Sequence, residues 1–151
     1  MSATIKVIES VTPYGENLSI VKTKDGDTII ANRKEDGSFR WKENEIAIFI
    51  SEGSIIPDNI LKERGYWDEE KDRGLLDGSK RNRVKKRKWG PDKIEGDGLL
   101  FKVENFKEKI LYNSRDTDGY VSIQDGTSTK YLYVCIGDDV SNFFDIIEYQ
   151  S

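Results

Sequence analysis

The N-terminal third of the chain alternates between apolar and polar residues in short runs separated by turn residues. Three runs, at residues 4–11, 18–24 and 28–32, are rich in β-branched side chains and predict strands. Asp25-Gly26, between the second and third runs, predicts a hairpin turn. Residues 45–51 are almost continuously apolar, which is typical of a strand buried on both faces.

The middle of the chain predicts one short helix, which begins at Pro57 or Asp58 and ends at Gly65. A long, polar and charged surface segment follows, from residue 66 to residue 83. Further strands are predicted at residues 84–89, 98–103, 119–124 and 130–136, and a last short helix or strand at 142–149.

Short strands joined by Gly and Asp turns, with one brief helix, predict a mainly β protein. A chain of 151 residues fits a single compact domain with one core. We expect an OB-fold-like, five-stranded Greek-key barrel over residues 1–110, although other small barrels and sandwiches fit the same pattern. Residues 111–151 are expected to form a β-rich extension that packs on the barrel or completes it.

The composition excludes several kinds of site. Without histidine there is no Ser-His-Asp or Cys-His centre, and the single Cys135 excludes an intrachain disulfide and a Cys-rich zinc site. Asp116-Thr117-Asp118-Gly119 resembles part of a calcium loop but lacks its terminal Glu, so we expect turns and no metal. No cofactor is expected. The lone Cys, and the lack of any apolar run near the roughly 20 residues that span a bilayer, predict a cytoplasmic protein with no membrane partner.

The net charge of −4 hides a strongly basic segment, because residues 71–93 carry ten Lys and Arg against three Asp and Glu. If residues 84–89 form a strand, Lys85, Arg87 and Trp89 share one face. Cations beside an aromatic ring can follow a phosphate backbone and stack a base. Tyr66 and Trp67, just after the helix, are further candidates for stacking. The predicted nucleic-acid-binding residues are Lys80, Arg81, Arg83, Lys85, Lys86, Arg87, Lys88, Trp89, Tyr66 and Trp67.

Other interpretations of these residues stay open. The basic segment fits a solvated loop, and it also fits a surface that docks on an acidic protein partner. In the second case the chain would be a protein-interaction module or an inhibitor. The aromatic residues also fit positions in the core or at its edge: Trp89, Tyr66, Trp67 and Trp41.

Six short segments follow one another in a suggestive order: Thr28–Asn32, Glu45–Ile50, Glu52–Pro57, Gly65–Glu70, Asn82–Lys85 and Gly98–Phe101. In this order they resemble the N-terminal OB domain of those ATP-dependent RNA ligases in which the OB module precedes the nucleotidyltransferase domain. The resemblance covers residues 5–101. It implies a module without catalysis of its own that binds RNA or nicked duplex and helps a ligase hold its substrate. A ligase catalytic subunit would then be a partner. The family's catalytic domain does not follow Phe101, and residues 111–151 have no place in the resemblance.

Lys34-Glu35-Asp36-Gly37 matches the Lys-x-Asp-Gly pattern in which ligases and capping enzymes attach AMP or GMP to the lysine. Asp-Gly between two strands, here with residues 39–42 as the second, is also an ordinary hairpin turn. We expect a turn. A split or minimal nucleotidyltransferase with Lys34 as nucleophile is the remaining alternative.

Overall fold

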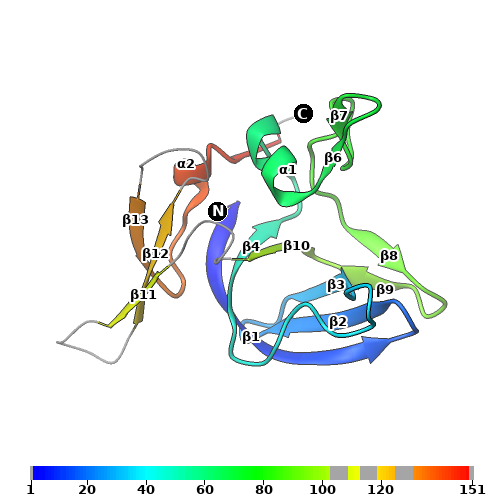
Figure 1. Cartoon of the computed structure of the whole chain (residues 1–151), viewed down its shortest axis with the longest axis horizontal. Helices are drawn as coiled ribbons and strands as arrows, with labels where there is room; N and C mark the ends of the chain where they lie inside the picture. The colour runs from blue at the N-terminus through cyan, green and yellow to red at the C-terminus, as the bar shows by residue number, and fades with distance from the viewer. Residues whose placement is uncertain (1, 103–108, 113–118, 125–130, 150–151) are drawn as a thin grey trace.

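The computed structural model describes residues 2–102, 109–112, 119–124 and 131–149 (Figure 1). Its main feature is a five-stranded antiparallel sheet with the strand order β10-β4-β1-β2-β3. The strands are β1 (Ala3–Tyr14), β2 (Leu18–Thr23), β3 (Thr28–Asn32), β4 (Ile46–Ser51) and β10 (Gly98–Lys102).

Smaller elements surround this sheet. They include the helix α1 (Asp58–Arg64) and four small sheets of two or three strands each. These elements lie in the connections between the main strands and in the C-terminal third. Neither α1 nor α2, the two helices in the described ranges, is long and apolar enough to cross a membrane. The remaining elements are β5 (Ser54–Ile55), β6 (Trp67–Asp68), β7 (Arg73–Gly74), β8 (Arg87–Trp89), β9 (Ile94–Gly96), β11 (Lys109–Tyr112), β12 (Gly119–Gln124), β13 (Tyr131–Cys135), α2 (Ser141–Phe144) and β14 (Ile147–Glu148).

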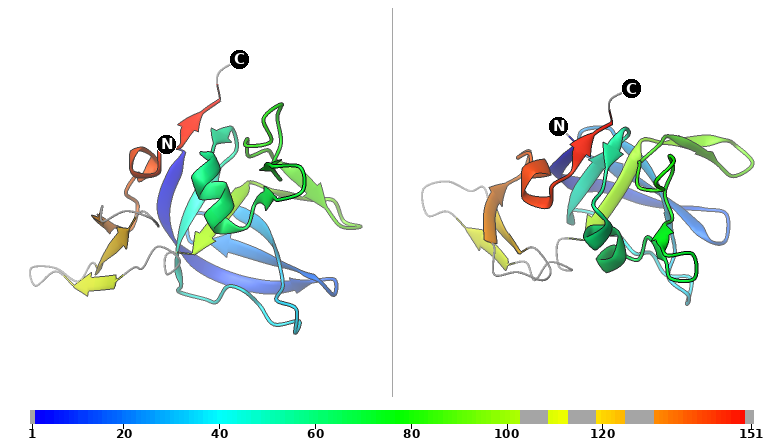
Figure 2. Two further views of the ribbon diagram at one scale, coloured as in Figure 1. Left: turned by 45° about the horizontal axis from the view of Figure 1, so that its top comes forward. Right: turned by 90° about the horizontal axis from the view of Figure 1, so that it is seen from above.

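The central sheet is curled into a half-barrel, consistent with an OB-like fold (Figures 1 and 2). The long strand β1 makes the curl possible, because its first half pairs with β4 and its second half pairs with β2. The register shifts between Ile8 and Ser10, where one strand passes from one partner to the other. The hairpin β8–β9 forms a separate two-stranded sheet beside β3, where the Asp97 N–H donates to the Thr28 carbonyl at 2.7 Å.

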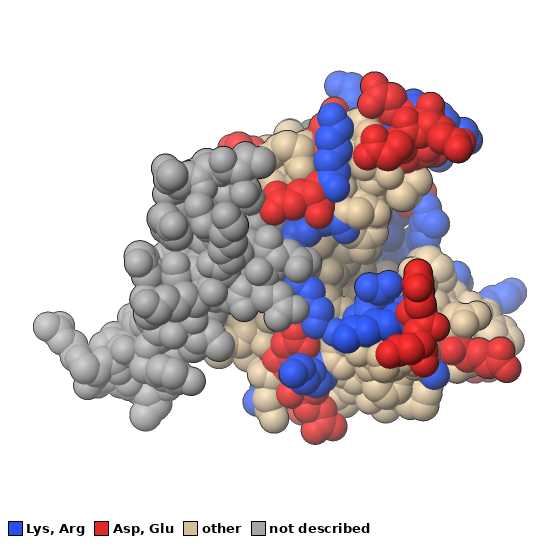
Figure 3. All heavy atoms as spheres, in the orientation of Figure 1, with Lys and Arg blue, Asp and Glu red and all other residues tan. Residues whose placement is uncertain are grey.

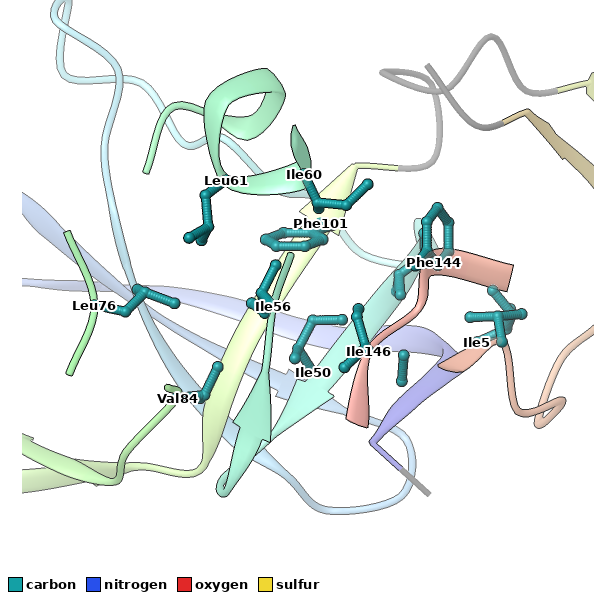
Figure 4. Packing of buried hydrophobic residues seen from close by; sticks show 13 residues of the cluster. Ile5, Ile50, Ile56, Ile60, Leu61, Leu76, Val84, Phe101, Phe144 and Ile146 are labelled. Atoms are coloured by element: carbon teal, nitrogen blue, oxygen red, sulfur yellow. The ribbon is translucent and has the colours of Figure 1, made fainter. Parts of the chain in front are cut away.

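The main hydrophobic cluster lies between the sheet, α1 and the C-terminal segment 136–149 (Figure 4). That segment is bonded to the start of β1: the Ser141 hydroxyl accepts from the Ser2 and Ala3 N–H groups. β14 then pairs with β5. The C-terminal segment therefore contributes to the same core as the barrel. The buried side chains shown in Figure 4 include Ile5, Ile50, Ile56, Ile60, Leu61, Phe101, Phe144 and Ile146.

The pattern of apolar residues predicts most elements correctly. The strands expected at residues 4–11, 18–24, 28–32 and 45–51 are confirmed, as is the helix ended by Gly65. Two expectations are wrong. Residues 39–42 form no strand, because Trp41 packs instead into a second buried cluster, which includes Val21 and Phe49. The strand expected at 84–89 begins only at Arg87, since Val84 is buried and its backbone bonds to Ser54 and Gly53.

Candidate nucleic-acid interface

A groove of about 690 Å³ lies on the concave side of the half-barrel. Residues of β3, β8 and β10 line it, together with the C-terminal end of α1 and the loop that leads into β4. Figure 3 shows a hollow between the region of α1 and β7 and the region of β3, with Lys and Arg along it.

Two hydrogen bonds hold the segments that carry the aromatic residues of the groove. Gly65 ends α1 with a φ of 84°, and the chain turns so that the Tyr66 N–H donates to the Leu61 carbonyl. The Tyr66 ring then lies 6.0 Å from that of Phe101. Tyr14, by contrast, holds the β8–β9 hairpin, because its hydroxyl donates to the Trp89 carbonyl at 2.7 Å.

The charge of the groove is opposite to the charge of the whole chain. Its lining includes six Lys and Arg but only one acidic residue, Asp77, whereas the chain carries a net charge of −4. Such a concave, cationic surface raises the local concentration of anions. The six cationic residues are Lys34, Arg40, Arg64, Lys85, Arg87 and Lys102.

Arg87 and Lys102 each contact a carboxylate. The Arg87 guanidinium donates to both oxygens of Asp77, from Nε at 3.1 Å and from Nη2 at 2.8 Å. These hydrogen bonds hold the pKa of the Asp77 carboxyl below its usual range. Lys102 Nζ lies 2.7 Å from Glu45 Oε2. Within the described part of the chain, no carboxylate lies within ion-pair distance of Lys34 or of Lys85.

One part of the groove combines half-buried cations with aromatic rings. Arg64 lies 5.0 Å from the centre of the Phe101 ring, and its Nη1 donates to the Lys102 carbonyl at 2.6 Å. Burial lowers the pKa of the Arg64 guanidinium to about 9, so it stays charged at neutral pH. Burial also raises the pKa of the Tyr66 hydroxyl, against the opposing charges of Arg40 and Arg64.

Four of the ten residues predicted from the sequence line the groove: Lys85, Arg87, Trp89 and Tyr66. Trp89 and Tyr66 are both half-buried. Trp67 lies outside the groove lining, where Lys62 Nζ lies 4.6 Å from the centre of its ring.

The other five predicted residues also lie outside the groove lining. Lys80 and Arg81 are exposed in the turn after β7, and Lys88 is exposed on β8 opposite Glu95. Arg83 covers the Tyr149 ring at 4.1 Å. Lys86 lies within 4 Å of three carboxylates, those of Glu52, Glu95 and Asp97. The basic segment therefore divides between the groove and other surfaces, and does not form one cationic face.

Several groove residues were not predicted as binding residues. Trp41 lies between Arg40 and Lys42 in the sequence, and that pattern was the available signal. Arg64 and Lys102 are cations at the ends of a helix and a strand, and nothing in their sequence neighbourhood marks them. They reach the groove through the folding of distant segments.

Lys34 also lines the groove, although the sequence suggested it as a nucleophile. It is exposed at the start of a turn in which the Gly37 N–H donates to its carbonyl at 2.9 Å. The expectation of a turn is confirmed. Asp116 and Asp118, considered for calcium, lie outside the described residues, and the described residues contain no group of three or more His, Cys, Asp or Glu that could hold a metal ion.

No protein-family model matches this chain, and no curated protein matches it either. Solved structures of an RNA ligase from Naegleria gruberi do match. A mutant with ATP and Mn aligns at a TM-score of 0.58 and 19% identity, over 99% of this chain and 36% of that chain. A mutant with AMP and Mn gives 0.57 at 19% identity, over 98% and 35%, and the ligase with PPi gives 0.56 at 19% identity, over 99% and 35%.

These matches show a fold related to part of an RNA ligase. The chain spans about a third of the length of the ligase structures it matches. The structural likeness extends over almost the whole chain, whereas the sequence resemblance stops at Phe101. The structural match thus includes the last third of the chain, for which the sequence resemblance gave no matching segment.

Proposed function

We propose that this chain is a nucleic-acid-binding module, for RNA or nicked duplex, that works beside a ligase catalytic domain or subunit and has no catalytic activity of its own. The observation that carries the proposal is the charge of the groove: six Lys and Arg and a single Asp line it, in a chain with net charge −4. Phosphates that enter such a groove release counterions, which favours binding.

Two further observations support it. Trp89 and Tyr66 are half-buried in the groove lining, where a base could stack on them. The fold is related to part of a protein that is an RNA ligase, which supports a ligase-related role for the groove.

We also propose that the chain has no catalytic activity, and labelling of Lys34 tests this part of the proposal. Nucleophilic lysines are activated by burial or by a neighbouring cation, whereas Lys34 is exposed on a turn. Incubation with α-labelled ATP or GTP and Mn or Mg should leave the protein unlabelled. A covalent adduct that disappears in Lys34→Ala would refute this part of the proposal.

A pair of matched double variants tests the binding site. Lys85→Gln/Arg87→Gln removes two groove cations, and Arg81→Gln/Lys88→Gln removes two cations of the same segment that lie outside the groove lining. Binding of fluorescent single-stranded RNA is measured by anisotropy from about 50 to about 200 mM salt. The groove variant should lower the slope of log affinity against log salt by about 1.4, at about 0.7 per cation for a single strand.

The control variant, with the same change in net charge, should keep most of the affinity and the slope. Equal losses in both variants would mean that the chain binds through a diffuse basic segment. Binding that does not depend on Lys85 and Arg87, or no binding at low salt, would refute the proposed site.

A further inference from the structure

We infer that the groove takes a short unpaired stretch of nucleic acid, with its bases directed inward, and that it does not take a double helix. The inference rests on the proposed function and names the substrate class of the same site. The groove volume, about 690 Å³, lies in the range of pockets that enclose small organic ligands. It suits about two nucleotides.

The cations of this segment that lie outside the groove alternate with acidic residues and form no continuous cationic face for a duplex. Lys86 is surrounded by the carboxylates of Glu52 at 3.9 Å, Glu95 at 3.6 Å and Asp97 at 3.8 Å. A duplex carries its phosphates on a convex outer surface, and a protein that binds it needs cations that reach that surface. Here Lys86 is offset by three acids and Lys88 lies opposite Glu95 in the hairpin, while Lys85 and Arg87 line the groove.

The aromatic side chains of the groove are usable only by unpaired bases. Trp89 and Tyr66 are partly exposed in the lining. Below them, Trp41 and Phe101 are only 6% and 3% exposed, and Lys102 and Arg64 cover them. In a duplex each base is already stacked on its neighbours, so its faces cannot pack on a protein ring.

The order of the residues along β8 also fits a single strand. Arg87 and Trp89 are two positions apart on the same strand, which places them about 6.6 Å apart along it. This spacing is close to the step between neighbouring nucleotides of an extended single strand. One nucleotide can therefore place its phosphate on Arg87 while the next stacks its base on Trp89. Arg40, Arg64 and Tyr66 form a second group of the same kind in the lining.

A competition experiment separates the substrate classes. A labelled single-stranded RNA of about ten nucleotides is bound to the wild-type chain and displaced by the unlabelled strand, by a blunt duplex of the same sequence, or by that duplex with an unpaired overhang. The single strand and the overhang should compete at least about tenfold better than the blunt duplex. They should also quench tryptophan fluorescence, which the duplex should leave unchanged.

Two tryptophan variants provide the matched control. Trp89→Leu should weaken single-strand binding about tenfold or more with the salt slope unchanged, because it removes a stacking ring and no charge. Trp67→Leu, outside the groove lining, should leave affinity unchanged. If Trp89→Leu fails to fold, the fluorescence comparison of wild-type protein with strand and duplex gives the same test.

The outcomes distinguish the inference from the proposed function. A blunt duplex that competes as well as the single strand, with binding still dependent on Lys85 and Arg87, would overturn the inference and leave the proposed function intact. Equal losses in the Trp89 and Trp67 variants would also overturn it. Loss of any dependence on Lys85 and Arg87 would instead refute the proposed function.

Discussion

Asp77 and Arg87 form an ion pair on the groove wall. Under the proposed function, RNA must open this pair before a phosphate can bind the arginine. Their side chains are 27% and 50% exposed, so the pair stabilises the fold by only about 0.5 kcal/mol. The Asp77 carboxylate also repels a phosphate bound nearby, by about 0.6 kcal/mol at about 7 Å in water. Asp77→Asn removes both penalties, about 1 kcal/mol in total, and should raise the affinity for single-stranded RNA about fivefold.

The assay is an anisotropy titration of labelled single-stranded RNA at low salt, with Asp72→Asn as the control. Asp72 is exposed in the β6–β7 turn and lies outside the groove lining, so its substitution makes the same charge change away from the site. The control should change the affinity by less than about twofold, because solvent and salt screen a distant charge. Unchanged or weaker binding in Asp77→Asn, or an equal gain in the control, would show that Arg87 does not hold phosphate.

Three further predictions concern stability. Phe144→Ala should cost about 3–5 kcal/mol in urea unfolding, since Phe144 is buried in the main cluster, and a cost below about 1 kcal/mol would contradict its place there. Gly90→Ala should destabilise the protein more than Gly15→Ala in thermal melts: both glycines have a positive φ, but only at Gly90 would the added Cβ lie 2.3 Å from the Tyr14 hydroxyl. Equal losses would exclude that clash. The lowered pKa of Asp77 means that its contribution to stability is present above about pH 4 and is lost as the pH falls through the folded-state pKa. Chemical denaturation should therefore show a smaller loss between pH 5 and pH 3 in Asp77→Asn than in wild type, and identical losses would contradict it.

The fold could be predicted where local pattern decides the structure. The alternation over β1 to β3 and the continuous apolar run of β4 each indicate strands without knowledge of distant contacts. Gly65 ends α1 for a local reason, its positive φ. The contribution of the C-terminal segment to the core could not be foreseen, because Phe144 reaches its partners through pairing between residues 136–140 and the start of β1, which are far apart in the sequence.

The candidate site could be predicted only in part, since the sequence shows which side chains are charged but not where each side chain points in the fold. Alternation grouped Lys85, Arg87 and Trp89, and all three line the groove although only Arg87 and Trp89 lie on β8. Two neighbouring cations lie outside the groove lining because they contact residues that are distant in the sequence. Arg83 covers Tyr149, and Lys86 lies among three carboxylates.

The three tryptophan side chains report directly on the proposed entry of nucleic acid into the groove. Trp89 lies in the groove lining, Trp67 lies outside it under Lys62, and Trp41 is buried beneath Lys102. Indole N–H resonances of ¹⁵N-labelled protein, assigned with single Trp→Phe variants, are followed while single-stranded RNA is added. We predict that the Trp89 signal shifts most and the Trp67 signal stays in place. A shift of Trp67 with Trp89 unmoved would contradict the account.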